Sequence, residues 1–247
     1  MTITFETKCW EKDWIYILCK GYLEKMIDNC NYPFDNKVLF INNVKNVELV
    51  KKHAQKKVDK GIIDKYVIVE EYATNALEFF GIQKDDFKGG YYYSIAELVS
   101  IYLCKTDFLL HFSSDTCITK DNNNWVKNTL AIMNRNEEYF VANPVWNGCI
   151  EEAQSESFDE TESNFIGFGF SDQCYLVRTK DFQNPIYNES NIASARYPEY
   201  GGELFEKRVD AYMRNHNLKR ITSKNASYVH KNYKEISFWE KILHRFI

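Results

Sequence analysis

The sequence predicts a single α/β domain with a Rossmann-like, mostly parallel central sheet and helices on both of its faces. Its 247 residues suit one such domain. Short runs rich in β-branched and aromatic residues alternate with segments of helical period, which is the pattern of a parallel sheet with helical crossovers. Polar residues follow each of these buried runs. Right-handed crossovers place all of these strand ends along one edge of the sheet.

Residues 1–120 contain four strand and helix units in alternation. We predict strands over 2–7, 37–44, 65–72 and 107–115. We predict helices over 14–30, 46–61, 73–81 and 89–106. In these helical segments, apolar residues recur three and four positions apart. Gly61 closes the second helix, and a pair of glycines precedes the fourth.

Residues 121–247 follow a looser pattern. We predict a helix over 122–136, a strand over 138–146, a strand pair over 167–182, a helix over 200–217, and a strand with a loop over 218–233. Between them, residues 151–164 are acidic and rich in serine. Such a stretch has little apolar area to bury, so we expect a mobile loop there.

The composition favours a globular protein in a reducing compartment. Hydrophobic residues make up 45% of the chain, and the net charge of -4 creates no general basic field for nucleic acid. We therefore expect no nucleic-acid partner. Seven cysteines without a CxxC spacing fit free thiols better than a disulfide framework. We expect a cytoplasmic location, and the sequence does not indicate an oligomeric state.

The C-terminal segment bears on membrane contact. Residues 236–247 alternate bulky apolar residues with Lys241, His244 and Arg245 at helical spacing. We expect this helix to pack on its own domain, and the alternative is a peripheral contact with a membrane surface. The N-terminus lacks the basic and apolar regions of a leader peptide, and no apolar run approaches about 20 residues.

Polar residues at four strand ends predict a single binding crevice. The ends are Thr7 to Cys9, Asn42 with Asn43, Glu70 with Glu71, and Ser113 to Asp115. In open sheets of this kind, ligands bind beyond the carboxyl ends of the strands. Asp115 suits a hard divalent cation that completes its shell with water and diphosphate oxygens. The alternative is that Asp115 only caps the turn at the strand end.

The order of these motifs resembles the nucleotide-sugar glycosyltransferases of the GT-A fold, especially the family 2-like inverting enzymes. The segments "FETKCWEKD", "FINNV", "GYYYSIAEL" and "LLHFSSDT" stand in the places of a base-contacting turn, the polar end of the second strand, a helix and the metal-binding DxD motif. The resemblance covers residues 1–120 well and the remainder more loosely. It implies a nucleotide-binding half over 1–120 and an acceptor-binding half over 121–247.

The resemblance implies a hexosyltransferase-like enzyme of polysaccharide biosynthesis. Such an enzyme transfers a sugar with inversion from a nucleoside-diphosphate sugar donor to a hydroxyl of a glycan acceptor, assisted by Mn²⁺ or Mg²⁺. The donor-binding residues that it implies are Thr7, Cys9, Glu11, Asn42, Asn43, Tyr93, Ser113 and Ser114, and the implied metal ligands are Asp115 and His230.

Two departures from the family pattern affect this site. Ser113-Ser114-Asp115 keeps only the last carboxylate of the DxD motif, and Asn42 and Asn43 replace the acids of the second strand. A single carboxylate should bind a metal weakly without the nucleotide. An amide at position 43 can still donate to and accept from the edge of a base.

Inversion requires a general base, because the acceptor oxygen loses a proton as it attacks C1. The resembling family places this carboxylate near the start of a late helix, which corresponds to "YGGELFEKR". Glu203 is the first choice and Glu206 the second. Glu203 could instead be a first-turn acid that favours the helix dipole. Asp172 in "FSDQCYL" is a further candidate, as base, acceptor ligand or turn residue.

Two other functions fit parts of the pattern. A sugar nucleotidyltransferase also uses a doubly wound sheet, but it usually has a Gly-rich, basic loop after the first strand, which "TKCWEKDW" lacks. A catalytically degenerate, glycan-binding module of the same fold would account for the incomplete DxD motif. Trp10 and Trp146 are the aromatic residues that we expect to contact ligand, whereas Trp14 and His111 belong in the core.

Overall fold

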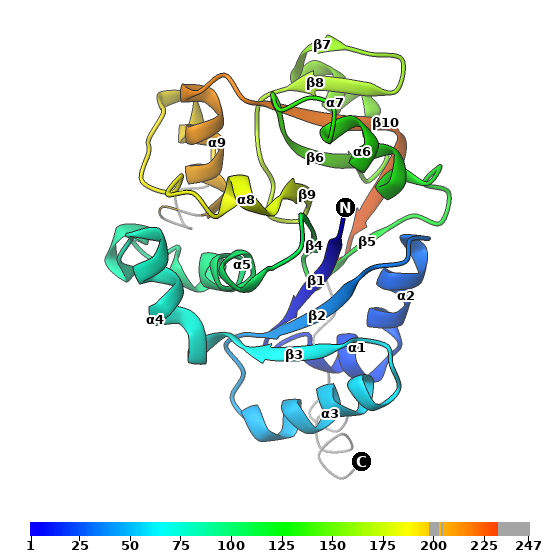
Figure 1. The fold of residues 1–247 in the computed structure, drawn as a ribbon, viewed down its shortest axis with the longest axis vertical. Helices are drawn as coiled ribbons and strands as arrows, with labels where there is room; N and C mark the ends of the chain where they lie inside the picture. Colours follow the sequence, from blue (N-terminus) through cyan, green and yellow to red (C-terminus); the bar gives the residue numbers. More distant parts are fainter. Residues whose placement is uncertain (198–202, 204, 232–247) are drawn as a thin grey trace.

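One ten-stranded sheet runs through the described molecule (Figure 1). The computed structural model describes residues 1–197, 203 and 205–231. The strand order is β3-β2-β1-β4-β9-β6-β10-β8-β7, and β5 pairs with β10. The strands are β1 (Ile3–Cys9), β2 (Asn36–Ile41), β3 (Lys65–Ile68), β4 (Phe108–Phe112), β5 (Thr116–Ile118), β6 (Tyr139–Trp146), β7 (Ser157–Glu160), β8 (Asn164–Gly167), β9 (Cys174–Arg178) and β10 (Lys219–His230). The predicted α/β class is confirmed.

Helices pack against both faces of this sheet. The α-helices are α1 (Trp14–Cys19), α2 (Tyr22–Asn29), α3 (Val47–Asp59), α4 (Val69–Phe80), α5 (Tyr91–Leu103), α6 (Trp125–Met133), α7 (Ile150–Ser155), α8 (Thr179–Phe182) and α9 (Phe205–Asn215), with 3-10 turns η1 (Lys84–Phe87) and η2 (Ile192–Arg196). Helices α1, α2, α3 and α6 share a core with Leu110, whereas α4, α5, α8 and α9 share another with Leu109. Successive residues of β4 thus face opposite layers, as strand geometry requires.

The four strands of the first half are parallel, as predicted. β1 lies between β2 and β4, and β3 pairs with β2 on the outside. Two local predictions are wrong. The helix expected over 14–30 is divided by Gly21, whose φ of 74° is a conformation that other residues avoid. The strand expected over 65–72 ends at Ile68, and Glu70 lies in the first turn of α4, where the helix dipole favours an acid.

The second half mixes strand directions. β9 is antiparallel to both of its neighbours, β4 and β6, while β10 is parallel to β6 and antiparallel to β8 and β5. The strand pair expected over 167–182 is wrong in its pairing, because β8 and β9 bond to other strands and not to each other. Helix α9 and strand β10 form where helical and strand patterns predicted them.

The acidic stretch 151–164 forms a helix and a paired strand, so the prediction of a loop is wrong. It contains the end of α7, strand β7 and the start of β8, and β7 pairs antiparallel with β8. Two of its acids are ion-paired: Glu156 pairs with Arg196 and Arg220, and Glu160 lies 2.8 Å from Lys224 Nζ. Main-chain pairing and ion pairs therefore order a segment that has little apolar area to bury.

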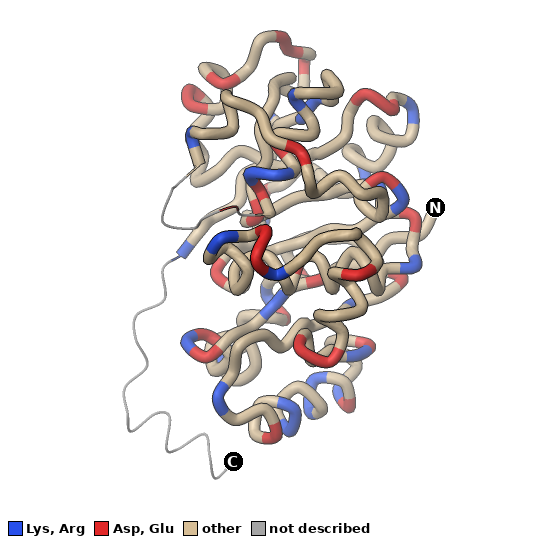
Figure 2. Tube along the Cα trace, turned by 90° about the vertical axis from the view of Figure 1, so that its left-hand side faces the viewer, with Lys and Arg blue, Asp and Glu red and all other residues tan. Residues whose placement is uncertain are grey.

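The surface charges, the cysteines and the lengths of the helices bear on where the protein acts. Acidic and basic residues are interspersed over the described trace on the side shown in Figure 2. All seven cysteines are unpaired thiols, as predicted. No helix among the described residues has the length and apolarity needed to cross a bilayer. The helix predicted over 236–247 lies outside the described residues.

Candidate active site

The carboxyl ends of β1, β2 and β4 surround a cavity of about 570 Å³, which we call the strand-end cavity. It is lined by Lys8, Trp10, Glu11, Lys12, Asn42, Asn43, Lys45, Tyr92, Tyr93, Ser113, Ser114 and Asp115. The structure thus brings together most of the residues proposed for donor binding. Parallel pairing in register explains this, because it aligns the ends of strands that lie far apart in the sequence.

Strand β1 contributes Lys8 rather than its neighbours. Thr7 is buried and its Oγ1 donates to the carbonyl of Phe112 at 2.7 Å, and Cys9 is fully buried. Lys8 points the other way, as alternation along a strand requires, and lines the cavity. Burial lowers the pKa of Lys8, but its ion pair with Glu97 outweighs this and raises the pKa above its ordinary value. The ammonium group therefore stays charged at the base of the cavity.

The rim of the strand-end cavity is held by side chains that bond to the backbone. Glu11 accepts a hydrogen bond from Lys45 N–H at 2.9 Å. The amides of Asn42 and Asn43 both donate to the carbonyl of Tyr92 at 3.4 Å, which ties the end of β2 to the start of α5. Trp10 is 40% exposed on this rim, and so its ring is available to a ligand.

Asp13 also organises this cavity, although the sequence pattern did not single it out. Its carboxylate accepts from Trp10 N–H at 2.8 Å and from the hydroxyl of Ser114. Burial raises the pKa of Asp13 to about 7, against the opposing effect of the Ser114 hydrogen bond. Its place just before α1, the usual position of a capping acid, was the available signal.

Asp115 and His230 meet at the edge of the strand-end cavity. The Oδ2 atom of Asp115 lies 3.0 Å from Nε2 of His230, and both side chains are about one quarter exposed. Antiparallel pairing of β5 with β10, with His230 opposite Thr116, brings together residues 115 positions apart. Burial raises the pKa of Asp115, and the charge of His230 opposes this shift without cancelling it.

The donor set at this position fits a divalent metal ion bound with a ligand. A carboxylate oxygen and an imidazole nitrogen converge, and both are accepted by Mn²⁺. Among the described residues, no third histidine, cysteine or acid completes a group around them. The remaining positions would go to water and phosphate oxygens, so this pair fits a metal that arrives with a diphosphate.

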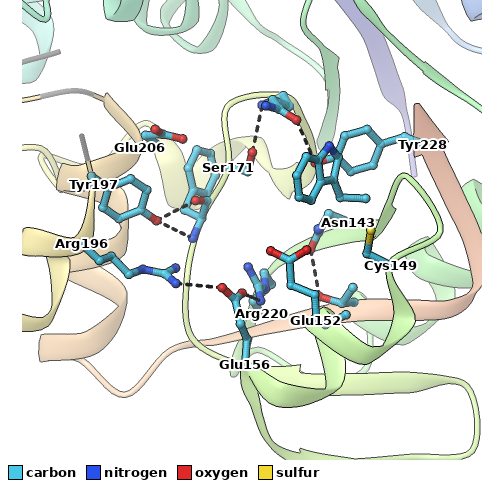
Figure 3. A pocket seen from close by; sticks show the side chains of 15 residues that line it. Asn143, Cys149, Glu152, Glu156, Ser171, Arg196, Tyr197, Glu206, Arg220 and Tyr228 are labelled. Atoms are coloured by element: carbon cyan, nitrogen blue, oxygen red, sulfur yellow. Dashed lines mark hydrogen bonds and ion pairs between the residues drawn. The ribbon is translucent and has the colours of Figure 1, made fainter. Parts of the chain in front are cut away.

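A second cavity of about 440 Å³ lies beside the first, and we call it the arginine cavity (Figure 3). It is lined by Asn143, Trp146, Cys149, Glu152, Ala153, Glu156, Phe170, Ser171, Gln173, Arg196, Tyr197, Glu206, Arg220, Thr222 and Tyr228. Gln173 links the two cavities, because its carbonyl accepts from Ser113 N–H at 2.8 Å and its side chain accepts from the hydroxyl of Tyr228. Trp146 is 39% exposed here.

Glu206 is the acid of "YGGELFEKR" that lines the arginine cavity. It lies in the first turn of α9, and its Oε2 accepts a long hydrogen bond from Asp172 N–H at 3.4 Å. Burial, followed by the negative charge of Asp172, raises the pKa of Glu206 to about 8. Asp172 in turn accepts from Ser113 Oγ through its carbonyl at 3.0 Å. Glu206 and Asp172 therefore lie where the two cavities join.

Glu203 has a different position. Its Oε1 accepts from Lys207 Nζ at 2.9 Å, and its N–H donates to the carbonyl of Phe87. It does not line the strand-end cavity or the arginine cavity. The pair with Lys207 is an i,i+4 contact of the kind that supports the start of a helix.

Buried charged residues lie beneath the junction of the cavities. His111 is in the core as predicted, with Nδ1 2.5 Å from Glu6 Oε1 and its ring stacked on Tyr175. Glu97 pairs with Lys8 and lies 3.9 Å from His111 Nε2. The sequence signal for this network was Glu6, an acid at a buried position of a strand, which is unusual unless it is paired.

The comparisons with known proteins agree with this geometry. No family model and no curated protein matches the sequence. Among solved structures, the chain is similar to glucosyl-3-phosphoglycerate synthase from Mycobacterium tuberculosis in complex with Mg²⁺ and UDP, with a TM-score of 0.51 and 13% identity over 98% of this chain and 74% of that one. It is also similar to S. aureus TarS, with a TM-score of 0.52 and 12% identity over 94% of this chain and 37% of TarS.

A third match is S. aureus TarS 1-349 in complex with UDP-GlcNAc, with a TM-score of 0.50 and 11% identity over 95% of this chain. The chain spans 60% of that fragment. Identities at this level establish the architecture alone. The protein has the fold of the GT-A nucleotide-sugar glycosyltransferases.

Proposed function

We propose that the protein is a metal-assisted glycosyltransferase that moves a hexosyl group from a nucleoside-diphosphate sugar to a hydroxyl of a glycan acceptor, with inversion. The observation that carries this proposal is the pair Asp115 and His230, 3.0 Å apart at the strand-end cavity of a GT-A fold. The resemblance of the sequence motifs to the GT-A nucleotide-sugar glycosyltransferases supports our further proposal of a role in polysaccharide biosynthesis in the cytoplasm.

The strand-end cavity is the proposed donor site. Trp10 offers an exposed ring for stacking, and Asn43 has an amide that can both donate and accept at the edge of a base. Lys8, Lys12 and Lys45 line the same cavity and supply positive charge for a diphosphate. Asp115 and His230 would hold Mn²⁺ or Mg²⁺, which when bound neutralises charge on the leaving diphosphate.

The arginine cavity is the proposed acceptor site, and Glu206 is the proposed base in place of Glu203. The acceptor oxygen forms a bond to C1 as the bond from C1 to the diphosphate oxygen breaks, and the acceptor proton passes to Glu206. A pKa of about 8 makes the carboxylate of Glu206 a stronger base than an ordinary glutamate. The ion pair with Lys207 keeps Glu203 outside both cavities.

Donor binding is tested by thermal shift with UDP-, GDP-, CMP- and dTDP-sugars, each with and without Mn²⁺. A ligand that binds only the folded state raises stability by RT ln(1 + [L]/Kd). We expect one nucleotide class to raise the melting temperature only when Mn²⁺ is present, and slow hydrolysis of that donor.

Two outcomes would point elsewhere. Stabilisation by a nucleoside triphosphate, with release of pyrophosphate from a sugar phosphate, would indicate a nucleotidyltransferase. Stabilisation by a glycan but by none of the nucleotide sugars would indicate a binding module without turnover.

A further inference from the structure

The arginine cavity contains two guanidinium groups that converge on one carboxylate. Arg196 Nη1 lies 3.1 Å from Glu156 Oε1, and Arg220 Nη2 lies 2.9 Å from Glu156 Oε2. Figure 3 shows Arg196 and Arg220 reaching Glu156 from two sides, one from η2 and the other from β10. Burial alone would raise the pKa of Glu156, but the two arginines hold it below its ordinary value. The carboxylate is therefore ionised and fills the space between two cations.

Both guanidinium groups also lie against Gly169. A methyl group at that position would be 2.5 Å from Arg196 Nη2 and 3.0 Å from Arg220 Nη1. Gly169 has a φ of 111°, and the hydroxyl of Tyr197 bonds to both the N–H and the carbonyl of the next residue, Phe170. A side chain at position 169 would thus displace the arginines, so the glycine leaves room for the two cations to approach one another.

The backbone under these arginines is held by buried contacts. Ser194 Oγ donates to the fully buried Asp210 at 2.6 Å, and Asp210 also pairs with Arg214. This fixes η2 to α9 and so fixes the origin of the Arg196 side chain. Arg220 is only 8% exposed and lies near the start of β10. The cationic pair is therefore preorganised.

Glu156 satisfies this pair incompletely. Each arginine uses a single nitrogen for it, and Arg220 Nε is buried without a partner among the described residues. One carboxylate offers a single negative charge to two guanidinium groups. A phosphate monoester carries about -1.5 to -2 charges and three acceptor oxygens, and guanidinium forks match such oxygens in pairs.

Glu156 belongs to a segment that can open locally. Glu156 is about one third exposed and follows α7, a helix of six residues. Strand β7 begins at the next residue and pairs only with β8, with an irregular register between Ser157 and Asp159. None of the residues of α7 is buried and β7 is almost entirely exposed, and segments with few buried contacts open at low free-energy cost. We propose that Arg196 and Arg220 anchor a phosphate group on the acceptor, and that Glu156 occupies this anchor until the acceptor displaces it.

This inference rests on the proposed function, since it names the acceptor class of the same site. It is tested by calorimetry at low salt with inorganic phosphate and glucose 6-phosphate, and with glucose as the neutral probe. The wild type is compared with Glu156→Gln, Arg196→Gln and Arg196→Lys. Glu160→Gln is the matched control, because it removes the same charge from the adjacent strand at an ion pair outside the cavity.

We expect Glu156→Gln to bind phosphate and glucose 6-phosphate at least about tenfold more tightly than the wild type, because it removes the internal competitor. Arg196→Gln should bind both at least about tenfold more weakly, with Arg196→Lys in between and Glu160→Gln unchanged. Glucose should bind equally to all variants. Melting temperatures verify folding, and Arg196 is the safer of the two arginines to change because its side chain is more exposed than that of Arg220.

Equal affinity of Glu156→Gln and the wild type for phosphate would overturn the inference. Displacement of the bound phosphate by UDP together with Mn²⁺ would also overturn it, because phosphate would then occupy the donor site. UDP binding with Mn²⁺ is measured in every variant. If UDP binds and phosphate does not, the anchor is wrong and the proposed function stands. If phosphate binds at the arginines and no nucleotide binds, the proposed function fails and the anchor stands.

Discussion

The strand-end cavity and the arginine cavity differ in how their charges are balanced. In the strand-end cavity, three lysines and two carboxylates line the walls, and one of the lysines, Lys8, is paired with the buried Glu97. Lys12 and Lys45 lie in the segments that follow β1 and β2. In the arginine cavity, two arginines face three glutamates, and both arginines are paired with the single carboxylate of Glu156. The first cavity is thus ready to attract a diphosphate, whereas the second must exchange an internal anion for an external one. In the proposed function, the donor and the acceptor therefore meet different barriers to binding.

The largest expected effect separates chemistry from binding at the junction of the cavities. Glu206→Gln should lower kcat by ~10²–10⁴ with donor affinity and melting temperature nearly unchanged, because the amide cannot accept the proton. Steady-state kinetics and calorimetry with UDP and Mn²⁺ measure both quantities. Glu203→Gln is the matched control and should retain activity, since its partner is Lys207. Loss of activity in Glu203→Gln alone would return the base to Glu203.

The next effect belongs to the strand-end cavity alone. Asp115→Asn should weaken metal-dependent UDP binding by at least about tenfold, which corresponds to about 1.4 kcal/mol. Phosphate binding at the arginine cavity should not change. Asp107→Asn, at the amino end of the same strand, is the control, because Asp107 bonds to Thr2 far from the cavity. Unchanged UDP affinity in Asp115→Asn would remove Asp115 from the site.

A smaller effect should separate the two aromatic rims. Trp10→Ala should weaken donor binding about two- to tenfold, and Trp146→Ala should raise the acceptor KM by a similar factor, because in the proposed function each exposed ring stacks on one substrate. Donor calorimetry and acceptor titrations at saturating donor measure the two constants. If each substitution affected both substrates equally, the cavities would not be separate sites.

The smallest effect is a shift in pH dependence. The pKa of Glu206 rises from its ordinary 4.5 to about 8, first through burial and then through the charge of Asp172. The value of kcat/KM should therefore increase with pH and level off above about 8. Asp172→Asn should move this profile to lower pH, and Glu206→Gln should abolish it. If Asp172→Asn left the pH profile unchanged, the profile could not be assigned to the titration of Glu206.

The same titration affects folding. Between pH 4.5 and about 8, the folded state keeps a proton on Glu206 that the unfolded state releases. The free energy of unfolding contributed by this proton is therefore present below pH 4.5 and is lost as pH rises through 8. Glu206→Gln should gain stability relative to the wild type as pH rises, which denaturation at pH 6 and pH 9 would measure.

The strand-end cavity was predictable from the sequence because parallel strands of similar register bring their ends together without further information. Asn42, Asn43 and Ser113 to Asp115 could be placed there from strand periodicity alone. The prediction that Thr7 and Cys9 line the cavity was wrong by one residue, because both are buried and Lys8 between them lines it. The end of a strand can be located from the sequence, but the alternation of side chains along the strand decides which residue faces the cavity.

The arginine cavity was not predictable in the same way. The pairings among β6, β8, β9 and β10 join strands that do not follow one another in the sequence, so the pairing of Arg220 with Glu156 depends on long-range topology. The acidic composition of 151–164 indicated a loop because it shows that the segment has little apolar area to bury. The composition of this segment does not indicate that Arg196 and Arg220, which lie elsewhere in the sequence, pair with Glu156.

Strand β10 fixes the distance between the two sites, with Arg220 near one end and His230 at the other. Its pairing with β6 is interrupted between Ser223 and Ser227, where three residues are added on one strand. An inserted residue is absorbed in such a bulge, whereas elsewhere in a strand it turns every following side chain to the opposite face. In the proposed function, residues 224–226 are therefore the place where an insertion could change the length of acceptor that reaches the sugar while both sites keep their residues.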